Sequence, residues 1–370
     1  MTDGEQERLA MEFDYQKVRA DFPHLDQRLY LNTASAGLAW KGAGKAAARF
    51  FETMYNRGYD GREDWRAVAG RVQTRIGRLA GVSPRDVGFA SSTTEALNLI
   101  AHSLPVQQGD RVVICEDEFP SVRAVAEIMA RRGAKLVAVP VCDEAARTQA
   151  LAAAARDSRF VLASHVHWES GARIDLEPLS AACGQNGAFL IVDGIQALGA
   201  AAVTAGLVDA YLASTFKWLI SGFGLAIAIT SPRLREALTP VFRGYANHPP
   251  SHDLRYSHAN YPGLVTLDAS LDYMERLGWH AIYLRNERLR RHLAVRLTDL
   301  GADVVTPENA AAIVSIRLSE PQVMMERLAA EGVSVEARGR CLRISPHFYN
   351  NEADVDRFAE ILAQLQKETD

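Results

Sequence analysis

The sequence has few cysteines, and their spacing excludes two kinds of small scaffold. The four cysteines, at positions 115, 142, 183 and 341, are scattered over 370 residues without a Cys-x-x-Cys pair. That spacing predicts neither a zinc knuckle nor a disulfide framework, and it suits a reducing compartment. His165 and His167 alternate along one expected strand, but no third ligand follows at a recognisable spacing. We therefore expect no metal.

Positive charge is not in excess, and long apolar runs are missing. Lys and Arg number 41 against 45 Asp and Glu, which gives a formal net charge of -4. A nucleic-acid partner is not expected, because binding to a phosphate backbone needs a surplus of positive charge. No uncharged apolar run reaches the ~20 residues that cross a membrane, and residues 1–8 are too polar for a secretory signal. The sequence predicts a cytoplasmic protein without membrane contact.

The length exceeds what one hydrophobic core usually organises, so we expect two domains. After a short polar helix at residues 14–22, helical stretches alternate with short apolar runs from about residue 66 to residue 250. Continuous apolar strands separated by helices predict an α/β fold with a mainly parallel sheet covered on both faces. Seven strands are expected, at residues 87–90, 111–115, 135–139, 160–165, 189–193, 210–213 and 225–230.

The C-terminal part of the chain has a different pattern. A stretch rich in Pro, His, Tyr and Arg at residues 233–263 predicts a loop region near a boundary. A helix interrupted near Gly278 is expected at 266–299, and a compact α+β unit follows, with strands at 312–318, 333–337 and 342–345 and helices at 321–331 and 352–367. We predict an N-terminal arm (1–30), a large domain (31–262) and a small C-terminal domain (263–370).

Polar residues follow several expected strands, where ligands bind in open parallel sheets. Four small hydroxyl residues at 91–94 open a helix after the strand at 87–90, which predicts a phosphate cradle or, equally, an ordinary helix N-cap. Asp193 ends a buried strand and needs a partner, although an N-cap role also explains it. Lys217 lies in an apolar stretch, where burial would lower its pKa and make it a nucleophile; the alternative is an exposed turn lysine.

The order of these features resembles the pyridoxal phosphate enzymes of fold type I, and in detail the aminotransferase class V family. That family includes cysteine desulfurases, kynureninases and isopenicillin N epimerase-like proteins. The resemblance covers nearly the whole chain and rests on five ordered motifs, at residues 30–34, 93–96, 193–199, 217–219 and 343–350. It implies a large domain with a seven-stranded sheet, a smaller α+β domain, a homodimer and pyridoxal 5'-phosphate as cofactor.

The resemblance assigns the cofactor-binding residues one by one. Lys217 corresponds to the lysine that forms the Schiff base, and Asp193 to the carboxylate beside the pyridine nitrogen. Gln196 corresponds to the group that bonds the phenolic oxygen of the ring, and Phe119 to the residue stacked on the ring, although an ordinary core aromatic also explains Phe119. The family's phosphate-binding positions correspond to Thr93, Thr94 and Ser214.

Substrate contacts follow from the same resemblance. Arg343 matches the arginine that grips the substrate α-carboxylate, the alternative being a surface salt bridge. Trp168 and Asn32 lie where relatives place residues near the ring or the substrate. His258 and Asn260 fall in the stretch that crosses to the neighbouring subunit of a dimer, although this stretch lacks the usual glycine-threonine pattern.

Departures from the family pattern bear on the reaction. Phe119 stands where desulfurases carry a histidine, so acid–base work falls to Lys217. Cys341 lies only two residues before Arg343, without a mobile loop, and we interpret it as structural. Phe216 replaces a frequent histidine and removes one phosphate donor.

We therefore expect a pyridoxal phosphate-dependent enzyme that acts on an amino acid or amine, with an aminotransferase as the leading hypothesis. Lys217 would be both the Schiff-base amine and the proton shuttle. The first alternative is a lyase that cleaves a C–S or C–C bond of a cysteine- or kynurenine-type substrate. The second is a family member that binds without turnover.

Overall fold

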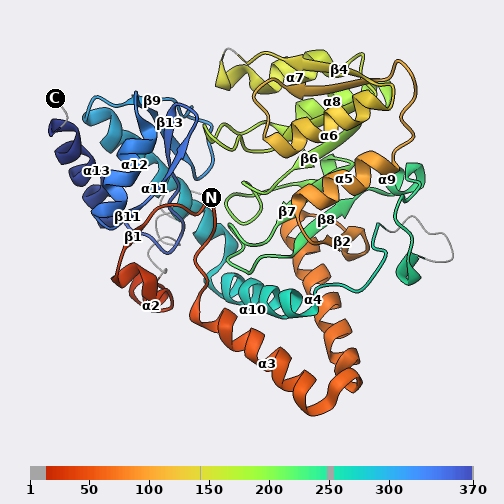
Figure 1. The fold of residues 1–370 in the computed structure, drawn as a ribbon, viewed down its shortest axis with the longest axis horizontal. Coiled ribbons are helices and arrows are strands. Elements are labelled where there is room, and N and C mark those ends of the chain that lie inside the picture. The colour runs from red at the N-terminus through yellow and green to blue at the C-terminus, as the bar shows by residue number, and fades with distance from the viewer. Residues whose placement is uncertain (1–13, 142, 248–253, 369–370) are drawn as a thin grey trace.

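The computed structural model describes residues 14–141, 143–247 and 254–368. Its largest element is a seven-stranded sheet with the order β2-β8-β7-β6-β5-β3-β4 (Figure 1). The strands from β7 to β4 run parallel, whereas β8 is antiparallel to both β7 and β2. The predicted mainly parallel α/β sheet is thus confirmed. Its strands are β2 (Val87–Ala90), β3 (Arg111–Cys115), β4 (Lys135–Val139), β5 (Phe160–Ser164), β6 (Phe189–Asp193), β7 (Ala210–Ser214) and β8 (Ala226–Thr230).

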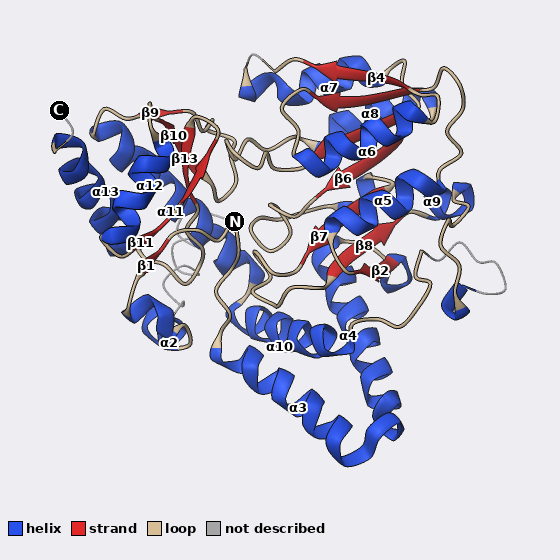
Figure 2. Ribbon diagram, in the orientation of Figure 1, coloured by secondary structure: helices blue, strands red, loops and turns tan. Residues whose placement is uncertain are grey.

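Helices cover both faces of this sheet (Figure 2). Alternate residues of β3 belong to different cores: Val112 and Ile114 pack with α5, α6 and α9, while Val113 and Cys115 pack with α4, α7, α8 and α10. Because side chains alternate between the faces of a strand, a fully apolar strand needs two covers. The covering helices are α4 (Arg62–Ala80), α5 (Thr93–Ser103), α6 (Pro120–Arg131), α7 (Arg147–Ala155), α8 (Leu176–Asn186), α9 (Pro232–Ala237) and α10 (Tyr261–Leu277).

A helical hairpin of α3 (Lys41–Arg57) and α4 lies against α10, at the bottom of Figure 1. Helix α3 was not predicted from the sequence, where the expected alternation of helices and strands began only at about residue 66. Only Ala43, Ala46 and Phe50 are buried along the seventeen residues of α3, so its apolar stripe is too sparse for a clear helical period.

The C-terminal unit contains a four-stranded antiparallel sheet with the order β12-β13-β10-β9. The single strand expected at 333–337 is two short strands, because β11 pairs with the N-terminal β1 while β12 pairs with β13. The elements are β9 (Asp303–Val304), β10 (Val314–Arg317), β11 (Val333–Ser334), β12 (Glu336–Arg338), β13 (Cys341–Ile344), α11 (Trp279–Asp299), α12 (Pro321–Ala330) and α13 (Glu352–Lys367).

The N-terminal segment joins the two sheets. After α2 (Tyr15–Ala20), β1 (Leu29–Tyr30) pairs with β11, and Asn32 then bridges to Ser345. Five residues further on, the amide of Gly37 donates to the carbonyl of Phe216, 2.9 Å away, next to Lys217. The contacts of residues 29–37 therefore span both units, and the division at 30/31 and 262/263 stays a prediction.

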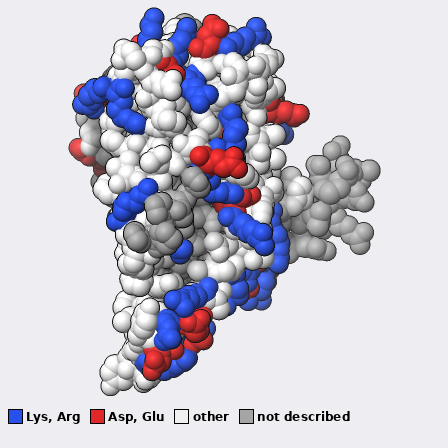
Figure 3. Space-filling model, turned by 90° about the vertical axis from the view of Figure 1, so that its right-hand side faces the viewer, with Lys and Arg blue, Asp and Glu red and all other residues white. Residues whose placement is uncertain are grey.

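Two further sequence expectations concern the surface. None of the helices in the described ranges is both long and apolar enough to span a membrane. Basic and acidic side chains are interspersed over the described part of the face in Figure 3. That face therefore offers no extended field of one sign.

The close approach of Gly37 to the lysine segment gives a stability prediction. A Cβ at Gly37 would lie 2.0 Å from the carbonyl oxygen of Lys217, so Gly37→Ala should destabilise the protein by about 1–3 kcal/mol. Gly44→Ala is the control, because its Cβ would meet nothing within 4 Å on helix α3 and should be neutral or stabilising by ~0.5–1 kcal/mol. Urea midpoints measure both; equal midpoints for the two variants would contradict the packing argument.

Candidate active site

The predicted catalytic residues meet at one edge of the large sheet. Asp193 ends β6, Ser214 ends β7, and Lys217 follows three residues after β7. Thr93 begins α5 after β2, which runs in the same direction as β7 because both are antiparallel to β8. The carboxyl ends of these strands therefore bring residues far apart in the sequence to one place.

Lys217 is buried, with 9% of its surface exposed, so it is not an exposed turn lysine. Its amine has no hydrogen bond or ion pair within the described ranges, and it lies 5.7 Å from the ring centre of Phe216. Burial lowers the pKa of this amine to about 7; the charge of Arg343 acts in the same direction and that of Asp193 opposes both. A substantial neutral fraction at neutral pH makes it a nucleophile and a base.

Asp193 is also buried, and one of its oxygens accepts from the amide of Ile195 at 3.0 Å. Burial raises the pKa of this carboxyl to about 6, whereas the hydrogen bond and Lys217 lower it. A cation placed beside the second oxygen would keep the carboxylate ionised. The protonated nitrogen of a pyridine ring is such a group.

The hydroxyl residues after β2 include both a helix N-cap and a group of hydroxyls that could bind a phosphate, the two alternatives that the sequence left open. Ser92 is the N-cap of α5 and accepts from the amide of Glu95. Thr93 and Ser214 form a reciprocal pair, with hydroxyl oxygens 2.9 Å apart and each amide donating to the other's hydroxyl at 2.8 Å. Thr94 bonds Ser121 at 2.9 Å and is exposed. Hydroxyls and a helix N-terminus thus stand together, as a phosphate requires.

Gln196 connects two segments beside the lysine. Its amide donates to the carbonyl of Ala34 at 3.0 Å, and its oxygen accepts from the indole of Trp218 at 2.8 Å. One amide proton remains for a ligand oxygen.

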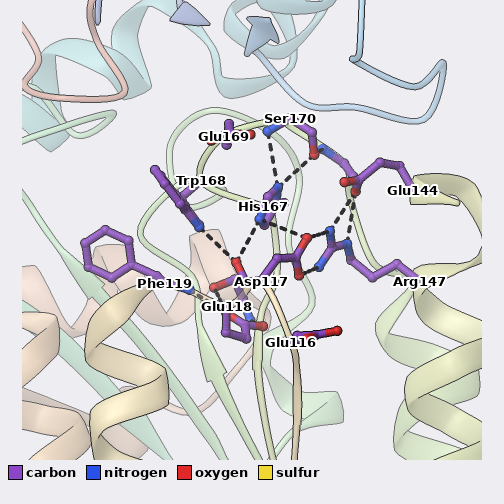
Figure 4. Close-up of polar contacts among 12 residues, drawn as sticks. Glu116, Asp117, Glu118, Phe119, Glu144, Arg147, His167, Trp168, Glu169 and Ser170 are labelled. Atoms are coloured by element: carbon purple, nitrogen blue, oxygen red, sulfur yellow. Dashed lines mark hydrogen bonds and ion pairs between the residues drawn. The ribbon is translucent and has the colours of Figure 1, made fainter. Parts of the chain in front are cut away.

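The loop that carries Phe119 is held by buried charged groups (Figure 4). The carboxylate of Glu118 accepts from the amide and the hydroxyl of Ser164, at 2.8 and 2.6 Å, and burial raises its pKa to about 7. The indole of Trp168 donates to the carbonyl of Asp117 at 3.2 Å, and the rings of Phe119 and Trp168 meet edge to face at 5.9 Å. The two predicted ring-side aromatics therefore lie together.

Asp117, Glu144 and His167 place ligand-type atoms within 4.8 Å of one another. Arg147 already occupies this cluster: its guanidinium bonds both oxygens of Asp117, at 2.8 and 2.7 Å, and an oxygen of Glu144 (Figure 4). His165 lies elsewhere and bonds the hydroxyl of Tyr211 at 2.8 Å. The cluster is thus an ion-pair network that anchors the loop, and it carries no argument for a metal.

Arg343 has polar groups ready for an anion. Its two terminal nitrogens donate to the carbonyl of Trp168 and the hydroxyl of Ser35, each at 2.7 Å, while its buried Nε has no partner among the described residues. The oxygen of Asn32 is likewise buried and unpartnered within the described ranges, and its amide donates to Glu336 at 3.2 Å. Arg343 is therefore no surface salt bridge.

Cys341 borders this group but is poorly suited to be a nucleophile. It is buried, and burial together with neighbouring Glu169 raises the pKa of its thiol to about 12. Only the thiolate attacks, so Cys341 is inert near neutral pH.

Asn260 and His258 are described only within one chain. Asn260 donates to the carbonyl of Gly224 at 2.8 Å and caps α10, and the ring of His258 lies 5.0 Å from that of Tyr245. Their predicted role across a dimer stays a prediction.

Sequence reasoning missed several residues that hold the site. No role was predicted for Ser35, Glu118, Arg147 and Glu336, which contact a predicted site residue or its loop, or for Arg338, which pairs with Glu336. Glu336 and Arg338 are two residues apart on one strand, a spacing that predicts that both side chains lie on the same face. The position of Arg147 depends on tertiary contacts that the sequence does not show.

The buried polar groups of this site match the aldehyde, the ring nitrogen and the phosphate of pyridoxal phosphate. Lys217 and Asp193 follow neighbouring strand ends and lie close enough for their charges to interact, and the hydroxyls of Thr93 and Ser214 lie at a helix N-terminus. A model of the aminotransferase class-V family matches residues 30–358. The chain belongs to this family. Its cofactor is pyridoxal 5'-phosphate, as the resemblance implied.

Relatives of known activity within the class V family cover most of the chain. Isopenicillin N epimerase of Streptomyces clavuligerus is 27% identical over 340 residues, which are 82% of this chain and 85% of the relative. Cysteine desulfurase of Salmonella typhi is 24% identical over 406 residues, covering 96% of this chain and 99% of the relative. These activities leave the aminotransferase prediction unconfirmed, and the lyase alternative fits them better.

Solved structures of similar fold agree with the family. The apo cysteine desulfurase from Thermococcus onnurineus NA1 gives a TM-score of 0.86 at 19% identity, covering 95% of this chain and 98% of that one. The cystine C-S lyase C-DES, in complex with cysteine persulfide, gives 0.85 at 19% identity, covering 92% and 99%. The likeness confirms the fold type I architecture.

The environment of Lys217 predicts its reactivity in cofactor-free protein. Because only a neutral amine is acylated, trace labelling with acetic anhydride should be half-maximal near pH 7 for Lys217, far below the ordinary lysine value of 10.5. Asp193→Asn should lower this midpoint, since the carboxylate favours the charged amine. Peptide mass spectrometry measures the labelling, with exposed Lys135 as reference. A midpoint near 10.5 would contradict the described environment.

Proposed function

We propose that this protein is a pyridoxal phosphate-dependent C–S lyase that acts on a cysteine-type amino acid. The observation that carries the cofactor-dependent chemistry is the buried, unpartnered amine of Lys217, whose pKa of about 7 is also shifted by the charges of Arg343 and Asp193. Relatives named as cysteine desulfurases and a structural neighbour named as a cystine C-S lyase support the substrate class.

In this proposal, binding is divided among three groups of residues. Thr93, Thr94 and Ser214 would hold the phosphate through their hydroxyls and the helix N-terminus. Asp193 would lie at the pyridine nitrogen, Gln196 at the phenolic oxygen and Phe119 against the ring. Arg343 would hold the substrate α-carboxylate, with Asn32 and Trp168 beside it. The cofactor, when bound, supplies a ring that accepts the electron pair left on Cα.

Lys217 would carry the proton in the reaction. Phe119 has no proton to exchange, and His165 and His167 are bonded to Tyr211 and Ser170. The amine of Lys217 is therefore the base that removes the α-proton, and its low pKa keeps it neutral for that task.

The state of Cys341 favours elimination over sulfur transfer to the protein. A buried thiol with a pKa of about 12 does not attack a substrate sulfur at neutral pH. The sulfur would instead leave as sulfide from cysteine or as a persulfide from cystine, and water would then release the carbon skeleton as pyruvate and the amino group as ammonia. An aminotransferase remains the second candidate, because the same lysine can move a proton between two carbons.

Product analysis tests the proposal. Cofactor-loaded protein should convert L-cysteine or L-cystine to pyruvate without an amino acceptor, measured with lactate dehydrogenase and NADH. Lys217→Ala should lower kcat by about 10²–10⁴-fold, since a positioned base contributes that much. Cys341→Ala should keep kcat within about threefold, because the thiol takes no part.

Three outcomes would count against the proposal. Amino-group transfer to a keto acid without pyruvate would favour the aminotransferase. Loss of sulfur release in Cys341→Ala with intact cofactor binding would favour a desulfurase. A protein that takes up no pyridoxal phosphate, judged by its visible spectrum, would favour the non-catalytic alternative.

A further inference from the structure

The hairpin of β12 and β13 presents the side chains of Glu336, Arg338, Cys341 and Arg343 on one face. Glu336 lies directly opposite Arg343, and Arg338 lies opposite Cys341. Opposed residues of an antiparallel pair point to the same side, and so do residues two apart along one strand. Arg338 is therefore a diagonal neighbour of Arg343, with roughly 7–8 Å between such positions.

Three of these four side chains have close hydrogen-bond partners among the described residues. One oxygen of Glu336 accepts from Asn32 and from Ser35, at 3.2 and 2.9 Å. Arg343 uses both terminal nitrogens on Ser35 and Trp168, and the thiol of Cys341 bonds Glu169.

Arg338 is the exception. Its one ion pair within the described ranges is a long contact of 3.5 Å with the other oxygen of Glu336. Its Nε is buried without a partner in the same ranges, while 41% of its side chain is exposed. Its charge lies close enough to lower the pKa of both Lys217 and Arg343. The guanidinium therefore borders the site and keeps most of its donors uncommitted.

We propose that Arg338 binds a second acidic group on the substrate, so that the preferred substrate is an amino acid whose side chain ends in a carboxylate. This inference rests on the proposed function, because it takes Arg343 as the partner of the α-carboxylate. A guanidinium binds a carboxylate through two parallel hydrogen bonds, and a buried Nε gains the partner that it otherwise lacks. Arg343 would then bind the α-carboxylate of the substrate, and Arg338 would bind the carboxylate at the end of its side chain.

A matched pair of ligands tests the inference. S-Carboxymethyl-L-cysteine and S-carbamoylmethyl-L-cysteine have nearly the same size and differ by one negative charge. The wild-type holoenzyme should release pyruvate from the acid with at least about tenfold higher kcat/KM than from the amide. Calorimetry with cofactor-loaded Lys217→Ala protein should give the same preference in Kd, without turnover.

Variants of the hairpin assign the preference to one side chain. Arg338→Gln should remove the preference for the acid and leave the amide nearly unchanged, whereas Arg338→Lys should keep part of it. Arg340→Gln is the matched control, because Arg340 is exposed in the turn of the same hairpin and should leave the preference intact. Unfolding midpoints close to wild type for all three variants support a local effect.

The outcomes separate this inference from the proposed function. Equal Kd values for acid and amide in the Lys217→Ala background, or a preference that survives in Arg338→Gln, would overturn the role of Arg338. A preference in Kd that depends on Arg338, without pyruvate from either ligand in wild type, would support Arg338 and contradict the lyase proposal.

Discussion

Burial of the Lys217 amine beside Asp193 is the constraint on which the rest of the site depends. Burial disfavours the charged form of this amine and lowers its pKa from 10.5 to about 7. Hydrogen bonds hold the residues on both sides of the lysine in place. Gly37 binds the carbonyl of Phe216, and Trp218 binds Gln196. The lysine is therefore held where strand ends and the N-terminal segment meet.

The motif at residues 343–350 explains how the small unit reaches this site. Three alternate residues each fix a different segment: Arg343 donates to the Trp168 carbonyl, Ser345 accepts from the Ala34 amide, and His347 lies 3.1 Å from the carbonyl of Trp218. Residues two apart on an extended segment share a side, so one short stretch contacts three loops at once. Two of the other ordered motifs, at residues 30–34 and 217–219, are thus in direct contact with this one.

What the sequence predicted depended on signals confined to one stretch of chain. Short, mainly apolar runs predicted all seven strands of the large sheet, and the ends of these runs led to the predictions for Asp193 and Lys217. Two kinds of feature could not be predicted from such local patterns. Helix α3 buries too few apolar residues to show a period, and Arg147 acquires its role only when Asp117 is folded beside it. The split of 333–337 into two strands likewise depends on partners far away in sequence.

Local sequence signals likewise indicate the catalytic chemistry more directly than they indicate the substrate specificity. In the proposed site, Lys217 would take and return a proton in elimination, in transamination and in sulfur transfer alike, so the lysine alone would not select among these reactions. The selection falls to the groups around it. Phe119 supplies no second proton carrier, and the short turn between β12 and β13 holds Cys341 as a buried thiol beside Glu169. The thiol of Cys341 is therefore unreactive near neutral pH, and the charged groups on the same face of the hairpin include Arg338 and Arg343. In the proposed reaction, Cys341 would therefore not act as a nucleophile, and Arg343 and Arg338 would be the side chains of this hairpin that bind the substrate.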